Sequence, residues 1–255
     1  MSDIKKDLAN LICLTIDVEW ASPEVLQDII TLLDERELRA TFFCTHADID
    51  VDGHEQAIHP NFRRNGDTMR KLSQEMGDTL NHYTDKMVYE YVVRHTKTFC
   101  PAAVGVRSHS LFYDSELLPI YRQAGIEYDS SHSLPLASGL SPTWKEHDIL
   151  EMPIYYVDHI DLINQMSGFR LEGLRMEQPG MKVFDFHPNM VFLNAATEAD
   201  YLESKSHYHD FEKLLSLRRS GPGIRNLFLD LLDFIKSEKL ITTTLADVNT
   251  AYRGI

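Results

Sequence analysis

The stretch LICLTIDVEW, residues 11–20, decides how the rest of the chain is interpreted. Its first part, Leu11–Ile16, is a short and continuous apolar run, which is typical of a strand buried on both faces of a parallel sheet. Two acids, Asp17 and Glu19, end the run. Because side chains alternate along a strand, a strand that continued through them would place both carboxylates on one face. An acid pair that faces solvent or caps the next helix is the alternative.

A helix is predicted directly after this strand. Ser22 suits the N-cap, Pro23 suits the first helical position, and Glu24 adds an acid to the first turn. Apolar residues then recur at helical spacing and form one face: Leu26, Ile29, Ile30 and Leu33. A second buried strand is expected over Arg39–Cys44.

The same alternation continues along the chain. Further strands are expected over residues 102–106, 126–128, 181–186 and 240–245, and helices over residues 85–99, 117–124 and 226–236. Alternating strands and helices imply parallel strands joined by right-handed crossovers. We therefore expect one α/β domain over residues 1–255, with its sheet closed or nearly closed into a barrel.

The composition argues against several classes of function. The chain of 255 residues has 25 Lys and Arg against 39 Asp and Glu, a formal net charge of −14. Such a chain repels phosphate backbones and anionic lipids, so neither nucleic-acid nor membrane-surface binding is expected. The first 20 residues have the pattern of neither a secretory signal nor a membrane span, and we expect a cytoplasmic protein. The three widely spaced cysteines are expected to be buried and reduced.

Acids, histidines and one arginine follow the predicted strands. Functional residues of parallel α/β proteins collect where strands end at their carboxyl side. The residues found there are Asp17, Glu19, His59, Arg107, His109, Asp129, Asp185 and His187. A metal-assisted hydrolase needs such a set, because it combines metal ligands with a base and a proton donor.

The histidines and the arginine have distinct expected roles. His59 and His187 are each followed by Pro and Asn, and a residue before proline is held in extended backbone. Two histidines in matching contexts on different strands favour a shared site over packed or surface histidines. Arg107 is expected to keep a catalytic carboxylate ionised, and His109 could reach a metal.

Six segments resemble the polysaccharide deacetylase superfamily with the NodB-type homology domain, carbohydrate esterase family 4 and its relatives. They are LTIDVEW (14–20), RATFFC (39–44), GHEQAIHPN (53–61), VGVRSH (104–109), KVFDFHPN (182–189) and LITTTLADV (240–248). Four short segments are most similar in sequence to the WbmS-like branch, which is linked to bacterial surface-polysaccharide loci: IHPNF, VRSH, YDSS and FHPN.

The resemblance implies a distorted (β/α) barrel that hydrolyses an N-acyl, usually N-acetyl, group of an amino sugar. It also implies a divalent metal, commonly Zn²⁺, held by one carboxylate and two histidines. On this basis Asp17 resembles the catalytic base and Glu19 the carboxylate ligand. His59 resembles the first histidine ligand, Arg107 the partner of the base, and His187 the catalytic acid.

The chain departs from the family pattern at the metal site. The second metal histidine normally falls four residues after the first, and Arg63 stands there; Glu19 is one methylene longer than the family's aspartate ligand. Either His109 supplies the missing ligand from a neighbouring strand end, which we favour, or the site is weakened or lost. His54 is the other candidate ligand.

The group that orients His187 is either Asp129 or Asp185, and Asp129 is favoured. The expected function is a metal-dependent hydrolase that deacylates an amino sugar or a sugar precursor, nucleotide- or lipid-linked, in surface-polysaccharide biosynthesis. Two alternatives stay open: a metal amidohydrolase or deformylase that acts on a small non-sugar amide, and a sugar-binding pseudoenzyme without metal.

Overall fold

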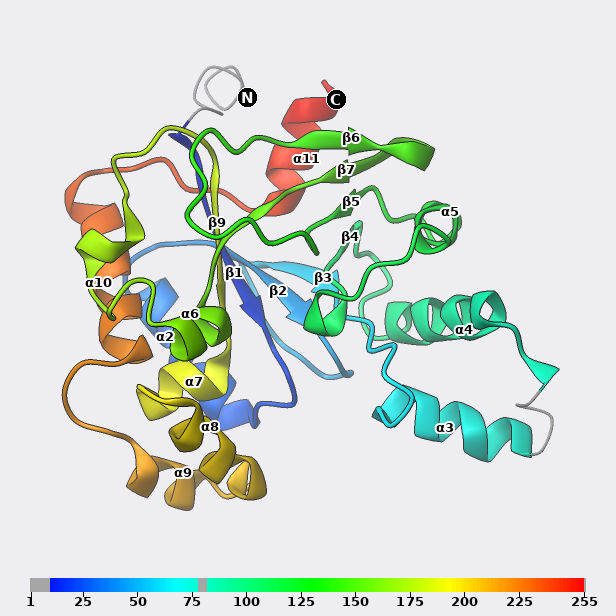
Figure 1. Cartoon of the computed structure of the whole chain (residues 1–255), viewed down its shortest axis with the longest axis horizontal. Helices are drawn as coiled ribbons and strands as arrows, with labels where there is room; N and C mark the ends of the chain where they lie inside the picture. The colour runs from blue at the N-terminus through cyan, green and yellow to red at the C-terminus, as the bar shows by residue number, and fades with distance from the viewer. Residues whose placement is uncertain (1–9, 78–81, 255) are drawn as a thin grey trace.

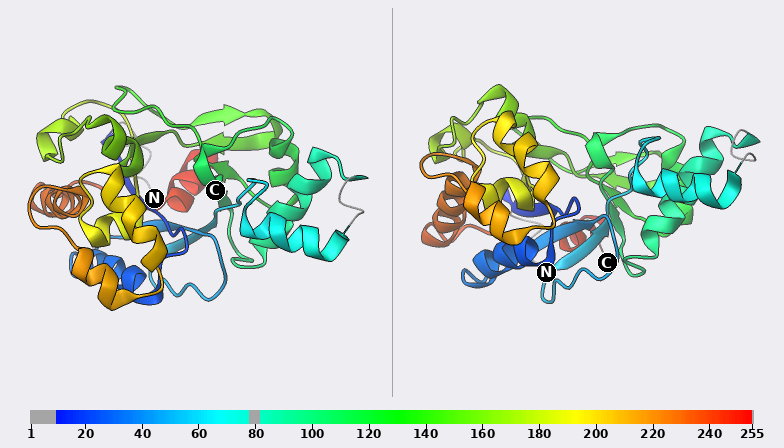
Figure 2. Two further views of the ribbon diagram at one scale, coloured as in Figure 1. Left: turned by 60° about the horizontal axis from the view of Figure 1, so that its bottom comes forward. Right: turned by 90° about the horizontal axis from the view of Figure 1, so that it is seen from below.

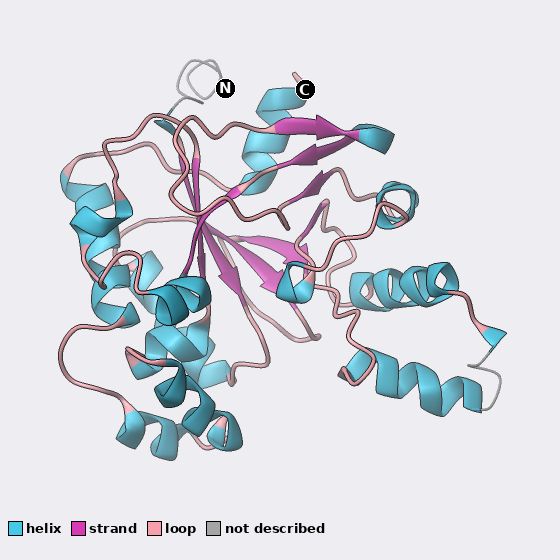
Figure 3. Cartoon of the chain, in the orientation of Figure 1, coloured by secondary structure: helices cyan, strands magenta, loops and turns pink. Residues whose placement is uncertain are grey.

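The computed structural model describes residues 10–77 and 82–254. The prediction about a leader or membrane span depends partly on residues 1–9, which lie outside the described residues. Within the described part, nine strands form one sheet (Figures 1 and 3). Their order is β6 (Thr143–Lys145), β7 (Ile149–Glu151), β5 (Tyr128–Asp129), β4 (Gly105–Val106), β3 (Glu55–Ile58), β2 (Ala40–Cys44), β1 (Ile12–Asp17), β9 (Lys182–Phe186) and β8 (Ile154–Val157).

The middle of the sheet is parallel and buried. Strand β1 pairs with β2 on one side and with β9 on the other, and every residue of all three strands is buried. Only β6 and β7 pair antiparallel among the described strands. The predicted α/β fold around a buried first strand is therefore confirmed, with β1 ending one residue later than expected.

The sheet curls into a half-barrel rather than a closed barrel. In the described residues, β6 and β8 are its two edges and do not pair with each other. The helices cover the sheet and extend beyond its ends (Figures 1 and 2). They are α2 (Pro23–Asp34), α3 (Asp67–Met76), α4 (Asp85–Lys97), α5 (Leu117–Gln123), α6 (Asp158–Asn164), α7 (Pro188–Leu193), α8 (Glu198–Ser204), α9 (Phe211–Leu217), α10 (Ile224–Ser237) and α11 (Leu245–Arg253).

Helix α2 forms as its sequence predicts. The Ser22 hydroxyl accepts a hydrogen bond from the Val25 amide at 3.4 Å, and Pro23 is the first helical residue. The predicted apolar face is buried in the core together with Val25. None of the helices in the described ranges combines the length and the apolar character that crossing a bilayer would require.

The predicted last strand over residues 240–245 is wrong. Thr242 makes only an isolated bridge to Ile12, and helix α11 begins at Leu245. The hydroxyl of Thr244 accepts a hydrogen bond from the Asp247 amide and caps the helix. A run of β-branched threonines predicts a strand, but this local cap competes with strand pairing and prevails.

A contact between two aromatic rings supports the end of β9. The rings of Phe186 and Phe228, which is on α10, meet edge to face with centroids 4.8 Å apart, and both side chains are fully buried. Phe186 is the last residue of β9 and precedes His187. The contact therefore holds the strand end from which His187 projects.

We expect the substitution Phe228→Ala to lower the free energy of unfolding by about 3–5 kcal/mol, because it leaves a cavity in the core. The exposed residue Asp230 lies on the same helix, and Asp230→Ala should change stability by less than about 0.5 kcal/mol. Urea denaturation followed by circular dichroism measures both. Equal effects of the two variants would contradict this account of α10.

Candidate active site

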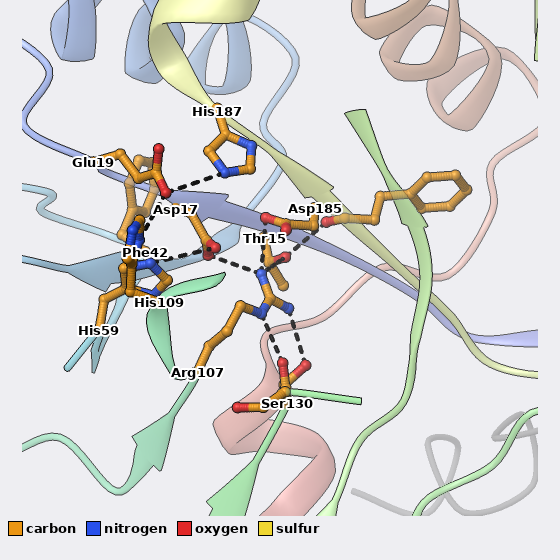
Figure 4. Close-up of polar contacts among 12 residues, drawn as sticks. Thr15, Asp17, Glu19, Phe42, His59, Arg107, His109, Ser130, Asp185 and His187 are labelled. Carbon is orange, nitrogen blue, oxygen red and sulfur yellow. Dashed lines mark hydrogen bonds and ion pairs between the residues drawn. The ribbon is translucent and has the colours of Figure 1, made fainter. Parts of the chain in front are cut away.

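The carboxyl ends of the central strands open into one cavity of about 580 Å³. Its polar floor comes from residues at or just beyond the ends of β1, β4 and β9: Asp17, Glu19, His109, Asp185 and His187. His59 follows β3 and lies beside this group (Figure 4). With Arg107, which contacts Asp17 and Asp185, the structure brings together seven of the eight residues predicted at the strand ends, and Asp129 is the exception.

The guanidinium of Arg107 contacts two residues of the floor, Asp17 and Asp185, and it is completely buried. Its Nη1 donates to the Thr15 hydroxyl at 2.7 Å and to Asp17 Oδ1 at 2.9 Å. The same nitrogen lies 2.9 Å from Asp185 Oδ1. On the other side, Nε and Nη2 donate to the carbonyl and the hydroxyl of Ser130 (Figure 4).

The two carboxyl groups beside Arg107 differ in their preferred charge. Burial alone would raise the pKa of Asp17, but electrostatic interactions with His59, Arg107 and His187 bring it below its ordinary value. Burial raises the pKa of Asp185 well above its ordinary value, although Arg107 opposes this. Asp17 is therefore the group that stays anionic, as the resemblance requires of a base.

The predicted metal ligands converge. One ligand atom from each of Glu19, His59 and His109 lies within 4.8 Å of the other two. His109 Nδ1 is 2.9 Å from Glu19 Oε1, and the two imidazole rings cross at 83° with centroids 5.4 Å apart. The carboxylate and the two imidazoles therefore surround one small volume.

The chemistry of these side chains fits a divalent cation. Both ring nitrogens of His59 are buried and have no hydrogen-bond partner in the described part of the chain. Burial lowers the pKa of His59 to about 4, so its imidazole is neutral and has a lone pair for a metal. A buried polar atom without a partner is costly, and a bound metal would remove that cost.

The orientation of the Glu19 side chain does not follow from the alternation of side chains along strand β1. Strand β1 ends at Asp17, and Glu19 and Trp20 have positive φ angles of 37° and 54°. The Trp20 ring packs edge-on against His109 with centroids 5.4 Å apart. A tight left-handed turn, an uncommon conformation for residues other than glycine, therefore aims the Glu19 carboxylate at the histidines.

His187 is oriented by Asp158. Asp158 Oδ2 accepts a hydrogen bond from the His187 amide at 2.7 Å, and its Oδ1 lies 2.6 Å from His187 Nδ1. Burial alone would lower the pKa of His187, but the carboxylates of Asp158 and Glu19 raise it well above its ordinary value. The imidazole therefore favours its protonated form, with Nε2 on the side of Glu19 at 3.6 Å.

The prediction that Asp129 orients His187 is wrong. Asp129 accepts hydrogen bonds from the Ser131 hydroxyl at 2.6 Å and from Lys145 Nζ at 3.0 Å. Asp158, which the sequence reasoning missed, begins α6 directly after the four-residue strand β8. The signal was the segment IYYVD at 154–158, a short apolar run that ends in an acid.

The residue that replaces the family's second histidine and the other candidate ligand both lie away from the metal-ligand group. Arg63 is exposed and lines the opening of the cavity. His54 Nδ1 accepts a hydrogen bond from the Ala40 amide at 3.2 Å, and its Nε2 is 3.2 Å from Asp34 Oδ1. The His109 amide donates to the Pro60 carbonyl at 3.0 Å, which fixes His109 beside the His59 segment.

Comparison with known proteins identifies the family of the chain. A family model described as WbmS-like polysaccharide deacetylase matches residues 14–205. The chain belongs to this family. The match includes all the residues described above as lining the floor of the cavity, and the resemblance seen in the sequence is confirmed.

Solved structures share the fold. WbmS from Bordetella bronchiseptica, described as a candidate polysaccharide deacetylase involved in O-antigen biosynthesis, is 25% identical with a TM-score of 0.75; the match covers 91% of this chain and 93% of that one. A mutant of the peptidoglycan deacetylase PdaC from Bacillus subtilis is 10% identical with a TM-score of 0.50 and coverage of 96% and 93%, which shows the fold alone. A comparison with curated proteins gave no match.

The contact between Asp158 and His187 leads to a prediction about the pKa of His187. Asp158→Asn should lower the pKa of His187 by about one unit or more, because a carboxylate in contact with an imidazolium favours the charged form. Asp129→Asn removes the same charge farther away and should leave the pKa of His187 nearly unchanged. Nuclear magnetic resonance titration of the histidine side chains in metal-free protein measures both. A shift of similar size in the two variants would refute the assignment of Asp158.

Proposed function

We propose that this chain is a metal-dependent hydrolase that removes an N-acyl group, foremost N-acetyl, from an amino sugar or sugar precursor in surface-polysaccharide biosynthesis. The observation that carries the proposal is the placement of Asp17 and His187 beside the Glu19–His59–His109 group in one cavity. The involvement of the Bordetella relative in O-antigen biosynthesis supports a sugar substrate. The cytoplasmic location stays a prediction.

Glu19, His59 and His109 would hold the metal. One carboxylate and two imidazoles are hard and borderline ligands that suit Zn²⁺, and three protein ligands leave a position open. A divalent ion bound there would make water a better nucleophile and polarise the amide carbonyl. Every other step falls to side chains of the chain itself.

Asp17 is the proposed general base. Its Oδ1 is occupied by Arg107, and its Oδ2 lies 3.6 Å from His59 Nε2, on the side of the metal ligands. The carboxylate is anionic because positive charges surround it, so Oδ2 can accept a proton from the attacking water. Arg107 keeps the carboxylate in one orientation during this transfer.

His187 is the proposed general acid. One of its ring nitrogens lies within 4.8 Å of a carboxylate oxygen of Asp17 and of Asp185, and Asp158 holds Nδ1. A protonated imidazole whose Nδ1 is fixed can donate its other proton, from Nε2, to the departing amine nitrogen. An amide nitrogen leaves poorly without this proton, so the two groups divide the proton transfers between them.

His59→Ala and Asp17→Asn should separate metal binding from turnover. His59→Ala should lose the metal, whereas Asp17→Asn should keep about one equivalent per chain and lose turnover by about 10²–10⁴-fold. His132→Ala, at an exposed histidine, is the control. Elemental analysis of protein purified without chelator gives the metal content. A wild-type chain that binds no metal, even after zinc is added, would indicate the pseudoenzyme.

A substrate panel identifies the acyl group and the carrier. We expect wild-type protein to release acetate from N-acetylated amino sugars faster than formate from N-formylated ones, and to leave small non-sugar amides nearly intact. Enzymatic assays of acetate and formate measure the products. Faster release of formate would assign a deformylase, and a preference for non-sugar amides would remove the sugar from the proposal.

A further inference from the structure

We infer that the substrate carries an anionic group, a phosphate or a carboxylate attached to the sugar, and that Arg63 and Lys205 bind it at the rim of the cavity. The inference rests on the proposed function, since it assigns the chemistry of the substrate in the same cavity. The inference depends on which charged residues lie on the floor of the cavity and which lie at its rim. The geometry of the metal site does not determine this distribution.

The charged residues of the rim are mostly basic. Four exposed charged residues line the cavity: Arg63, Asp67, Arg70 and Lys205. Asp67 and Arg70 form an ion pair with each other, so their charges cancel. The rim therefore has two uncancelled positive charges, although the chain as a whole has a formal net charge of −14.

The guanidinium of Arg63 is free while its backbone is fixed. The Arg63 amide donates to the Asn61 side chain at 3.0 Å, and the Arg63 carbonyl accepts from the Gly66 amide at 2.8 Å. Gly66 packs so closely on Asn61 that a Cβ there would lie 2.7 Å from the side-chain nitrogen. Within the described residues the Arg63 side chain makes no hydrogen bond or ion pair. A turn with a fixed backbone therefore places an unpaired cation at the cavity.

Lys205 provides a second cation from a different element. It follows α8, and its Nζ lies 4.6 Å from the centre of the Tyr201 ring, with no acidic partner in the described part of the chain. Tyr201 is buried and lines the same cavity. Helix α8 and the segment before α3 lie on opposite sides of the strand ends (Figures 1 and 2), so the two cations flank the opening.

Apart from Asp67, which pairs with Arg70 at the rim, the acids that line the cavity are on the floor and are already engaged. Asp17 and Asp185 share Arg107, and Glu19 belongs to the metal-ligand group. The cations at the floor are likewise paired with these acids or with Asp158, so the unpaired positive charges lie at the outer end of a substrate whose N-acyl group reaches the floor. The volume of about 580 Å³ is within the range of ligand pockets, about 300–1,000 Å³. An anion attached to the sugar satisfies this arrangement, and Arg63 suits it because a guanidinium binds phosphate or carboxylate with two hydrogen bonds.

The test compares neutral and anionic sugars. The probes are N-acetylglucosamine, its 1-phosphate and its 6-carboxylate, with the same three forms of the galacto epimer. Their affinities are measured by isothermal titration calorimetry on the Asp17→Asn background and their kcat/KM on the wild-type background. We expect at least one anionic form to bind about tenfold more tightly than its neutral parent at low salt, and salt to weaken only the anionic form.

Arg63→Ala and Lys205→Ala should each reduce the preference for the anionic form by about five- to tenfold. Arg64→Ala removes the same charge at the neighbouring exposed residue, which does not line the cavity, and should keep the preference. The response of the phosphate and the carboxylate separates the two sources of the anion. Equal binding of neutral and anionic forms, or equal losses in all three variants, would overturn the inference.

A failure of this inference can be distinguished from a failure of the proposed function. Anion binding that depends on Arg63, without hydrolysis of any sugar, would support the inference and reject the hydrolase. Hydrolysis of neutral and anionic sugars at equal rates, unaffected by Arg63→Ala relative to Arg64→Ala, would reject the inference and keep the hydrolase.

Discussion

The buried guanidinium of Arg107 is the interaction on which the rest of the site depends. It binds residues from β1, from the end of β9 and from the segment after β5, so one side chain links strands that are far apart in the sequence. A fully buried cation is costly unless its donors are satisfied, and removal of one partner of such a pair costs about 3–5 kcal/mol. Asp17, Thr15 and Ser130 satisfy those donors, and in return Asp17 is held anionic in the interior.

The same contact separates the roles of neighbouring acids. Three carboxylates, those of Asp17, Glu19 and Asp185, lie around the cavity floor, and equal ionisation of all three would be unfavourable. Arg107 favours the anionic form of Asp17, the histidines favour that of Glu19, and burial leaves Asp185 with a raised pKa. Asp17 can therefore accept a proton and Glu19 can bind a cation, because mutual repulsion does not set the ionisation of both carboxylates.

Much of the site was predictable, because its residues directly follow buried strands. The apolar run before Asp17 and the prolines after His59 and His187 are strong local signals, and they identified side chains that meet in space. His187 has the extended backbone that its proline requires, with φ −107° and ψ 123°. The predictions failed where local patterns are weak: Asp158 follows a strand of four residues, and a capped helix begins where threonines predicted a strand. The turn at Glu19 and the pairing of Asp129 with Lys145 depend on tertiary contacts that no spacing in the sequence reveals.

The residues at the floor and at the rim of the cavity lie on different kinds of secondary structure. The floor residues are tied to the shared sheet, whereas Arg63 lies on a connecting loop and Lys205 follows a short helix outside the sheet. Loops tolerate insertion and exchange far better than the strands that they connect. Exchange of these two connections would therefore change which ligands the rim admits while it leaves the residues of the floor in place.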